Sequence, residues 1–448
     1  MRIHLISIGG AVMHNLALAL QKNGHSVTGS DDEIYDPAKS RLQKAGLLPA
    51  AFGWYPEKIA PDLDLAILGM HARPANPELA RAQELGLPVF SFPEFIFRHA
   101  REKTRVVMAG SHGKTTTTAM NMHVLREAGR DFDYLVGAQL DGFDTMVRLS
   151  DAPVIVIEGD EYLSSAIDRR PKFLHYHPQI AIVTGIAWDH INVFPTFEEY
   201  KRQFELFIKN LGSDDLLIYY EKDAHLRQLA EGTGTFRKAS YSGFPATVKN
   251  GKTIARPTSL PPCELKVFGD HNLANFHAAW LVCRELGVSE TEFWRAAATF
   301  EGAAKRLQLL CEKQGFSAWQ DFAHAPSKVK ATVTAVKKLH PERKLVACVE
   351  LHTFSSLNKA FLPHYNGTLA GAGVACVYYN PHTLEMKKMP PIDPGEIQRN
   401  FNHPNLHVFT ERQELEGFLL SQNWRSSNLL LMSSGTFALP IAAVTAML

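Results

Sequence analysis

The sequence predicts an α/β protein of three domains, on three observations. The chain has 448 residues, of which 45% are hydrophobic and 21% charged, and this length and composition are typical of a soluble globular protein with two or three cores. Short apolar runs typical of buried strands alternate with helical patterns along most of the chain. A glycine-rich turn joins one such run to a helical pattern at 110–113, the arrangement that open α/β sheets use to bind ligands.

The charge balance and the cysteines exclude several classes of partner. Lys plus Arg number 47 against 46 for Asp plus Glu, so no overall field attracts nucleic acid or an anionic membrane. Any anionic ligand must therefore be held by local sites. The five cysteines form no C-x-x-C pair, which argues against a disulfide framework and against a structural zinc site. We expect a cytoplasmic protein with small-molecule substrates that binds neither nucleic acid nor membranes.

The first part of the chain has a βαβ pattern. The elements expected are a strand over 3–8, a turn at Gly9-Gly10, a helix over 13–22 and a strand over 26–29 that leads to Ser30 and Asp31. A G-x-G-x-x-G frame on Gly9 would place Ser7 and Val12 at glycine positions, which disfavours an NAD site. The turn is still compatible with another nucleotide, because a glycine turn at a helix N-terminus suits any phosphate.

Three further elements complete the expected first domain. They are a buried strand over 63–68, a helix over 76–85 and a strand over 88–92. A charged run precedes the next strand and ends near Lys103. The first domain is therefore expected to span residues 1–103.

The strand that ends at Ala109 leads into a predicted phosphate-binding loop. The loop comprises Gly110, Ser111, His112 and Gly113, and the helix that follows begins with Lys114, Thr115 and Thr116. Glycines let successive backbone N–H groups point at an anion, and the helix adds its positive end. Lys114 supplies a mobile charge, and Thr115 can bind magnesium. The loop has two residues between its glycines, whereas the general form has four before Gly-Lys.

Acidic side chains and a histidine follow the next two predicted strands. The strand over 154–157 leads into Glu158-Gly159-Asp160-Glu161, and the strand over 180–184 leads to Asp189 and His190. Taken one at a time, such residues are more often helix caps, loop residues or structural histidines. Together with Lys114 and Thr115 they predict a magnesium and nucleotide site at the carboxyl edge of a parallel sheet.

The rest of the second domain contains irregular chain and a helix. Residues 240–263 favour hairpins, and a helix begins near 268. Asn272 and Asn275 lie three apart and therefore share a face. Such a pair is usually a cap and a surface residue, but two amides can also contact a nucleotide base. The second domain is expected to span residues 104–301.

The third domain is expected to span residues 302–448. Lys305 and Arg306 lie at its start, and a strand ends in Asp321-Phe322-Ala323-His324 before a helix from about Ser327. Apolar strands are expected over 345–349, 373–378 and 429–432. Residues 429–448 carry no charge, but polar residues and Pro440 interrupt them. A buried strand, a turn and a short helix are therefore favoured over a membrane span.

Five motifs, in this order, resemble those of the Mur ligase family of peptidoglycan synthesis. They are Gly110-Ser111-His112-Gly113-Lys114-Thr115-Thr116-Thr117 (G-T-H-G-K-T-T-T in the family), Glu158-Gly159-Asp160-Glu161 (E-A-D-E), Asp189-His190 (D-H), His271-Asn272 with Asn275 (H-N-x-x-N), and Asp321-Phe322-Ala323-His324-Ala325-Pro326 (D-Y-A-H-H-P). An ordered series of this kind is far more specific than a single motif.

The resemblance implies three domains: a Rossmann-like UDP-binding domain, a central P-loop ATPase-type domain with a mostly parallel sheet, and a Rossmann-like α/β domain that binds the amino component. It implies an ATP- and magnesium-dependent ligase that acts through an acyl phosphate. The implied ATP ligands are Gly110, Ser111, His112, Gly113, Lys114, Thr115, Thr116, Asn272, Asn275, Arg306 and Asp321. The implied metal ligands are Thr115, Glu161 and His190, with His324 as a further candidate.

The resemblance also assigns roles to particular groups. Lys114, His190 and Arg306 are the implied catalytic residues. Asn272 and Asn275 are expected to contact adenine, and Asp321 the ribose. Arg306 is expected to contact the phosphates. The implied UDP-sugar ligands are Gly9, Gly10, Ser30 and Asp31.

Within the family, the first domain resembles ligases that take UDP-N-acetylmuramate. Three features are similar to the branch that attaches the murein tripeptide L-alanyl-γ-D-glutamyl-meso-diaminopimelate during peptidoglycan recycling. They are Ile34-Tyr35-Asp36-Pro37, Asn76-Pro77, and the segment 168–176. The alternative is the ligase that adds L-alanine. A monomer or a weak homo-oligomer is expected.

The chain departs from the family pattern at five positions. Val12 and His14 replace Gly and Ser, Gly185 replaces Asn, Lys305 replaces Arg, and Ala325 replaces the second His. Three other classes remain as alternatives: a non-catalytic nucleotide sensor, a folylpolyglutamate synthetase and a Rossmann oxidoreductase. ATP consumption that depends on a UDP-sugar would distinguish the ligase from the sensor. A folylpolyglutamate synthetase would lack the UDP-binding first domain, and failure to bind NAD would exclude the oxidoreductase.

Overall fold

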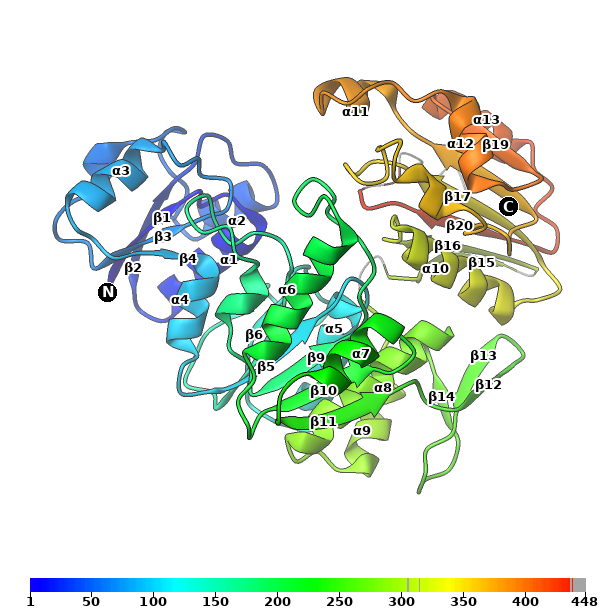
Figure 1. The fold of residues 1–448 in the computed structure, drawn as a ribbon, viewed down its shortest axis with the longest axis horizontal. Helices are drawn as coiled ribbons and strands as arrows, with labels where there is room; N and C mark the ends of the chain where they lie inside the picture. The colour runs from blue at the N-terminus through cyan, green and yellow to red at the C-terminus, as the bar shows by residue number, and fades with distance from the viewer. Residues whose placement is uncertain (304–305, 314, 436, 438–448) are drawn as a thin grey trace. The chain divides into compact units, whose positions relative to one another are not determined.

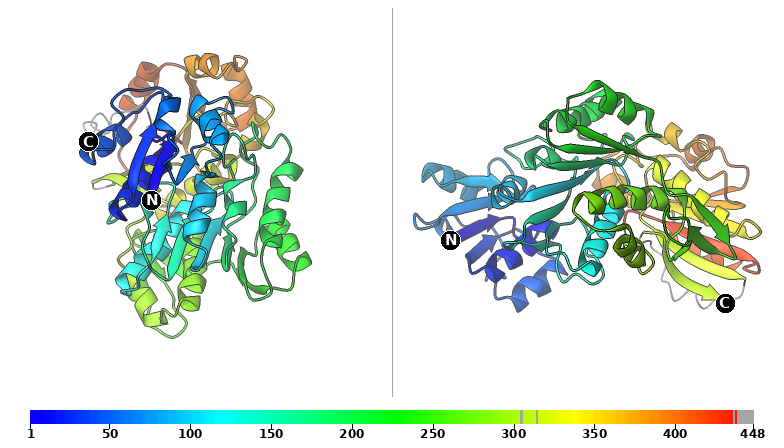
Figure 2. Two further views of the ribbon diagram at one scale, coloured as in Figure 1. Left: turned by 90° about the vertical axis from the view of Figure 1, so that its left-hand side faces the viewer. Right: turned by 90° about the horizontal axis from the view of Figure 1, so that it is seen from below.

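The structure is a computed structural model that describes residues 1–303, 306–313, 315–435 and 437 (Figures 1 and 2). Two compact units are defined by their internal contacts. The first comprises residues 1–186, 201–242 and 278–293, and the second comprises 187–200, 243–277 and 294–448. The predicted α/β class is confirmed, because most of the sheets are parallel and are connected by helices.

The chain begins with a four-stranded parallel sheet in the order β2-β1-β3-β4. Its elements are β1 (Arg2–Ile6), α1 (Ala11–Lys22), β2 (Ser26–Ser30), α2 (Ala38–Lys44), the 3₁₀ helix η1 (Pro56–Lys58), β3 (Leu65–Leu68), α3 (Pro77–Glu84), β4 (Val89–Ser91) and α4 (Phe92–His99). The predicted strand, turn, helix and strand at its start are confirmed. Asn76, at the predicted start of the helix over 76–85, caps α3 by accepting hydrogen bonds from Glu78 N and Leu79 N.

The following sheet has seven strands in the order β11-β10-β9-β5-β8-β6-β7, and only the edge strand β7 is antiparallel to its neighbour. Its elements are β5 (Thr104–Ala109), α5 (Lys114–Glu127), β6 (Asp133–Leu135), β7 (Val147–Arg148), β8 (Val154–Glu158), the 3₁₀ helix η2 (Lys172–His175), β9 (Ile180–Val183), α6 (Phe197–Lys209), β10 (Leu216–Tyr220), α7 (Ala224–Gly232) and β11 (Arg237–Tyr241). Strand β5 lies between β8 and β9, where Met108 pairs with Glu158 and Ala109 with Val183. The predicted site residues after these strands therefore start from adjacent positions.

A three-stranded antiparallel sheet and two helices follow. They are β12 (Ala246–Lys249), β13 (Lys252–Ala255), β14 (Cys263–Leu265), α8 (Asp270–Glu285) and α9 (Glu290–Ala297). The strands confirm the hairpins expected in 240–263. Helix α8 begins at Asp270, close to the predicted start.

The last sheet, in the second unit, has six strands in the order β15-β16-β20-β17-β18-β19, with β15 antiparallel to β16. Its elements are β15 (Gln308–Lys313), β16 (Phe316–Asp321), α10 (Pro326–Leu339), β17 (Lys344–Glu350), the 3₁₀ helix η3 (Leu362–Tyr365), β18 (Val374–Tyr378), α11 (Pro381–Met386), α12 (Pro394–Phe401), β19 (Leu406–Phe409), α13 (Arg412–Leu420) and β20 (Ser427–Met432). Strand β20, the last strand among the described residues, lies between β16 and β17. Both faces of the sheet are covered by apolar side chains, which form two separate clusters.

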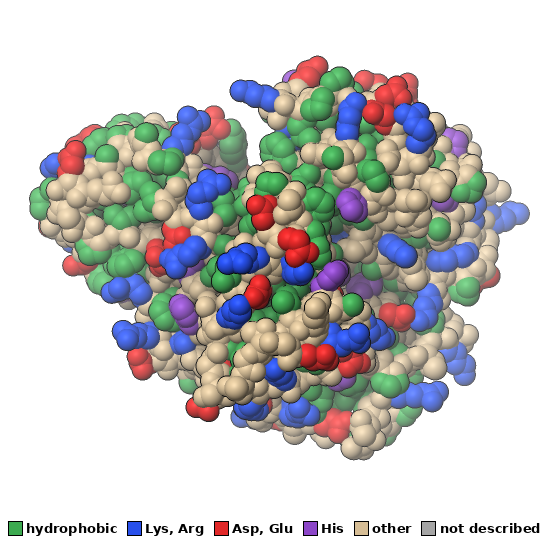
Figure 3. All heavy atoms as spheres, viewed as in Figure 1, with side chains coloured by type: hydrophobic (Ala, Val, Ile, Leu, Met, Phe, Trp, Pro, Cys, Tyr) green, Lys and Arg blue, Asp and Glu red, His purple; other side chains and the backbone are tan. Residues whose placement is uncertain are grey.

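Two expectations fall partly outside the described residues. The first is Lys305. The second is the short helix predicted after the turn near 435, which falls on residues 438–448. Among the described residues, no helix combines the length and apolar character needed to cross a membrane. On the face drawn in Figure 3, acidic and basic side chains are interspersed, as the near-neutral composition leads one to expect.

Candidate active site

The loop between β5 and α5 has the backbone shape of an anion-binding turn. Gly110 and Gly113 have φ values of +128° and +81°, which side chains other than glycine rarely adopt. A Cβ on Gly110 would lie 2.2 Å from Thr184 Oγ1, so close packing also requires glycine there. Ser111 N donates to Gly185 O at 3.0 Å and fixes the loop against the end of β9. The loop thus places the N-terminus of α5 at the carboxyl edge of the sheet.

Lys114 is the first residue of α5 and lies in a charged, buried setting. Its Nζ donates to Glu161 Oε2 at 2.5 Å and to Gly110 O at 2.6 Å. Burial by itself would lower the pKa of Lys114, but the charges of Glu161 and Asp160 outweigh it and raise the pKa. Lys114 is therefore an ammonium group held beside the loop by Glu161 and Gly110.

Thr115 lies one residue further along α5 and is 8% exposed. Its hydroxyl donates to Glu158 Oε1 at 2.7 Å, and the other oxygen of Glu158 accepts from Gly137 N at 2.8 Å. Because the proton of Thr115 points at Glu158, the lone pairs of Oγ1 are left for a cation. A hydroxyl with neighbouring carboxylates is a donor set that suits Mg²⁺. Thr116 follows at the same end of α5 and is also buried.

His190 belongs to the second unit. The residue before it, Asp189, lies close to three polar side chains. Asp189 Oδ2 lies 3.5 Å from Lys328 Nζ and 4.0 Å from His324 Nε2, and Ser355 Oγ lies 3.5 Å from Oδ1. Burial by itself would raise the pKa of Asp189, but Lys328, His190 and His324 together outweigh it and keep the pKa well below its usual range. His190 itself has a φ of +54°, so its side chain leaves the backbone from an uncommon conformation.

His324 lies in the same cluster and is neutral at pH 7. Burial lowers its pKa to about 4. Its Nδ1 lies 2.9 Å from Phe322 O, which places the ring proton on Nδ1 and leaves Nε2 as an acceptor. The hydroxyl of Tyr365 donates to His324 O and fixes the backbone. The ring is therefore chemically able to accept a proton or bind a cation.

The other predicted ATP ligands in the second unit are buried or partly buried. Asn272 and Asn275 are each 7% exposed on α8, and Asn272 Nδ2 donates to Phe268 O at 2.9 Å. Asp321 accepts from Leu307 N and Ala323 N, each at 2.7 Å. The guanidinium of Arg306 stacks on the Phe322 ring at 4.2 Å. The structure thus places these residues around the start of α8 and the end of β16, and their contacts with ATP stay predictions.

The predicted UDP-sugar residues meet at the carboxyl edge of the four-stranded sheet. Gly9 N donates to Asp31 Oδ2 at 2.8 Å, and a Cβ on Gly9 would lie 2.9 Å from that oxygen. Gly10 is the N-cap of α1 and has no side chain with which to cap the helix. Ser30 is fully buried, and burial raises the pKa of Asp31 to about 6. The first N–H groups of α1 are therefore open toward a ligand.

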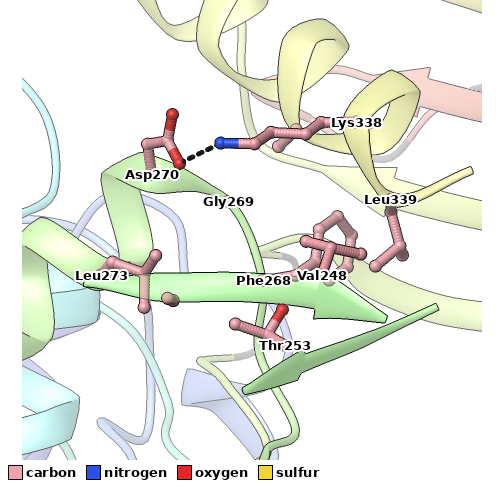
Figure 4. A pocket seen from close by; sticks show the side chains of 10 residues that line it. Val248, Thr253, Phe268, Gly269, Asp270, Leu273, Lys338 and Leu339 are labelled. Atoms are coloured by element: carbon pink, nitrogen blue, oxygen red, sulfur yellow. Dashed lines mark hydrogen bonds and ion pairs between the residues drawn. The ribbon is translucent and has the colours of Figure 1, made fainter. Parts of the chain in front are cut away.

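A small cavity of about 20 Å³ lies near the start of α8 (Figure 4). Phe268, Leu273, Thr253 and Leu339 line it, and Asp270 pairs with Lys338 above it. About 15 Å³ is enough for one water molecule. The cavity therefore does not fit a nucleotide.

The sequence predicts Glu158 and Asp189 as parts of the site, but it does not predict their partners. The contact of Glu158 with Thr115 spans 43 residues. Lys328, the partner of Asp189, lies 139 residues away along the chain. The position of Glu158 and Asp189 directly after buried strands was a usable signal, whereas Lys328 had none.

Comparison with known proteins matches two family models to this chain. The Mur ligase middle domain matches residues 108–283, and the Mur ligase family catalytic domain matches residues 2–104. UDP-N-acetylmuramate–L-alanine ligase of Carboxydothermus hydrogenoformans is 30% identical over 365 residues, which cover 79% of this chain and 76% of the relative. The chain belongs to the Mur ligase family. Members of the family are ATP-dependent amide ligases, and this Mur ligase is an ATP-dependent ligase of peptidoglycan synthesis.

Similarity extends to a second activity within the family. The UDP-N-acetylmuramate–L-alanyl-γ-D-glutamyl-meso-2,6-diaminoheptandioate ligase of Escherichia coli K12 is 29% identical over 78% of this chain and 79% of the relative. The crystal structure of a murein peptide ligase from Psychrobacter arcticus superposes with a TM-score of 0.66, at 23% identity, over 100% of this chain and 98% of that one. The latter similarity concerns the fold.

Proposed function

We propose that this Mur ligase joins UDP-N-acetylmuramate to the recycled tripeptide L-alanyl-γ-D-glutamyl-meso-diaminopimelate. The products are the UDP-linked peptide, ADP and phosphate. Support comes from the Escherichia coli relative that carries this activity in its name and from the sequence features shared with that branch. Transfer of the γ-phosphoryl group from ATP drives the reaction, because hydroxide is too poor a leaving group for a carboxylate to form an amide directly.

The observation that supports the choice of the tripeptide is the segment 168–176, which the resemblance associates with the tripeptide branch. Ser164 Oγ donates to Asp168 O at 2.8 Å, and Arg170 pairs with Asp168 at 2.6 Å. Lys172 Nζ lies 2.5 Å from Asp160 Oδ2. The segment is thus held by its own hydrogen bonds directly beside the proposed reaction site. A fixed wall of this kind suits an extended amine substrate better than a single amino acid.

The proposed reaction has two chemical steps. The lactyl carboxylate attacks the γ-phosphorus of ATP, the bond to the β-phosphate oxygen breaks, and ADP and an acyl phosphate form. The amine of the tripeptide then attacks the acyl carbon, the amide bond forms, and phosphate leaves while the nitrogen loses a proton. Lys114 neutralises charge on the transferring phosphoryl group, and the backbone N–H groups of 110–113 hold the phosphates.

The residues at the site fit magnesium. Thr115 Oγ1 has its lone pairs available, and Glu158 and Glu161 supply carboxylates near it. We propose Thr115, Glu161 and His190 as the ligands, and Glu158 as the group that orients the hydroxyl of Thr115. A bound Mg²⁺ supplies positive charge at the transferring phosphate. Asn272, Asn275, Asp321 and Arg306 are the proposed partners of the remaining parts of ATP.

The proposal is tested by phosphate release from ATP with UDP-N-acetylmuramate and either the tripeptide or L-alanine. Turnover with the tripeptide alone is expected. Turnover with L-alanine alone would overturn the tripeptide assignment and favour the second candidate, the L-alanine ligase, whose relatives reach 33% identity. Lys44 is an exposed lysine on α2, and the Lys44→Met variant serves as a control that is expected to keep full activity. The Lys114→Met variant is expected to have no activity.

A further inference from the structure

A half-buried lysine lies beside the proposed UDP-sugar site without an acidic partner. Lys58 Nζ donates to Ser30 Oγ at 3.1 Å and lies 4.5 Å from the centre of the Tyr55 ring. In the described part of the chain, Lys58 forms no ion pair with a carboxylate. A lysine removed from much of its water gains more from an anionic ligand than a fully exposed one does.

Ser30 connects this lysine to the turn before α1. Its backbone oxygen accepts from Ser7 N at 2.9 Å and from Ile8 N at 3.1 Å, while its hydroxyl accepts from Lys58. Ser7 has a φ of +70°, and its buried hydroxyl has no hydrogen-bond partner among the described residues. The turn itself therefore has uncapped helix N–H groups and a hydroxyl that can donate to an anion, and Ser30 connects its backbone to the ammonium group of Lys58.

A fully buried pair of side chains, His4 and Glu78, lies next to Ser30 and to the backbone of Tyr55. His4 Nε2 lies 3.1 Å from Glu78 Oε2, and both side chains have no exposed surface. The other oxygen of Glu78 accepts from Tyr55 N at 2.8 Å, and Glu78 also accepts from Ser30. Glu78 thus contacts both Ser30, which accepts a hydrogen bond from Lys58, and the backbone of Tyr55, three residues before Lys58.

We propose that Lys58 binds the diphosphate of the UDP-sugar, and that Glu78 is a positioning residue that sets Ser30 and Lys58 for this contact. The inference rests on the proposed function, because it requires a UDP-sugar at the first sheet. A UDP-sugar has two negative charges on its diphosphate, and Lys58 supplies positive charge next to the open N-terminus of α1. Uridine lacks these charges and gains nothing from Lys58.

The test is a calorimetric titration of UDP, uridine and UDP-N-acetylmuramate into the intact protein, without ATP. Lys58→Met is expected to weaken UDP about 10- to 100-fold, as for the loss of one hydrogen bond to a charged group. The affinity of Lys58→Met for uridine is expected to stay within about twofold of the wild-type value. The matched control Lys44→Met removes an exposed lysine of the same domain and is expected to bind all three ligands as wild type does.

Each other outcome has a distinct meaning. Wild-type affinity of Lys58→Met for UDP would overturn the inference and leave the proposed function intact. A loss confined to UDP-N-acetylmuramate would assign Lys58 to the lactyl carboxylate and overturn the diphosphate contact. Wild-type protein that does not bind UDP-N-acetylmuramate would overturn the proposed function itself.

Glu78→Gln tests the positioning role, because glutamine keeps the size of the side chain and removes its charge. It is expected to lower UDP affinity while leaving uridine affinity unchanged, so that the ratio of the two affinities falls. A lower melting temperature with an unchanged ratio would show that Glu78 only stabilises the fold, and would overturn the positioning role.

Discussion

The ion pair of Lys114 and Glu161 predicts a loss of stability on mutation, and the burial of the two side chains sets the magnitude of that loss. The side chains are 14% and 1% exposed, and the charged atoms lie 2.5 Å apart. Lys114→Met keeps the length of the side chain and removes the ammonium that Glu161 faces. Removing one member of a buried pair costs about 3–5 kcal/mol, and we expect about 3 kcal/mol here because Lys114 retains some contact with solvent.

A double-mutant cycle separates this pair from other effects. Glu161→Gln alone is expected to cost a similar amount, because it leaves the buried ammonium without its carboxylate. The double variant Lys114→Met/Glu161→Gln has no unmatched charge and is expected to lose only about 1–2 kcal/mol, which corresponds to a coupling energy well above 1 kcal/mol.

Thermal unfolding followed by circular dichroism measures the cycle. A loss of 3 kcal/mol corresponds to a fall in Tm of about 6–12 °C for a unit of roughly 150–250 residues, and the double variant should recover most of it. Losses that simply add in the double variant, or a Lys114→Met protein as stable as wild type, would refute the electrostatic reasoning. All three variants are expected to be folded at 25 °C and inactive.

Three further predictions concern the loop, the proposed metal ligand and the first sheet. Gly185→Asn is expected to weaken ATP binding measured by titration, because a Cβ there would lie 2.6 Å from His112 Cε1; unchanged affinity would contradict this packing. Thr115→Val is expected to reduce turnover about 100-fold and Thr115→Ser only slightly, because only serine keeps the hydroxyl that faces Glu158; equal rates would contradict the role. Burial raises the pKa of Asp31 to about 6, so the folded state binds this proton more tightly than the unfolded state, and stability falls as the pH rises from about 4 to 6. Asp31→Asn is therefore expected to raise the melting temperature at pH 8 and to have little effect at pH 4; an equal shift at both pH values would contradict it.

The phosphate loop and the parallel strands could be predicted because their signals are local. A continuous apolar run such as 180–183 marks a strand covered on both faces, and the glycines at 110 and 113 mark positions of positive φ. Helix α4 was missed although Ser91 and Glu94 form a capping box, because the apolar strand pattern of 88–92 overlaps its first turn.

The parts of the site that could not be predicted depend on contacts between distant residues. The sequence places Glu158 and Asp189 after strands, but it gives no distance from Glu158 to Thr115 or from Asp189 to Lys328. Lys58 has no motif around it, and its relation to Ser30 follows only from the pairing of β1 with β2 and the position of η1. Long-range packing, which a pattern of residue types does not encode, decides these contacts.

The central claim is that the carboxylate of the UDP-sugar is activated by the γ-phosphoryl group of ATP. It is tested most directly with UDP-N-acetylmuramate labelled with ¹⁸O in the lactyl carboxylate, in the presence of ATP, magnesium and the tripeptide. An acyl phosphate requires one labelled oxygen to leave with inorganic phosphate, so mass spectrometry should find one ¹⁸O in each phosphate released. Unlabelled phosphate, or label found in AMP, would contradict the account.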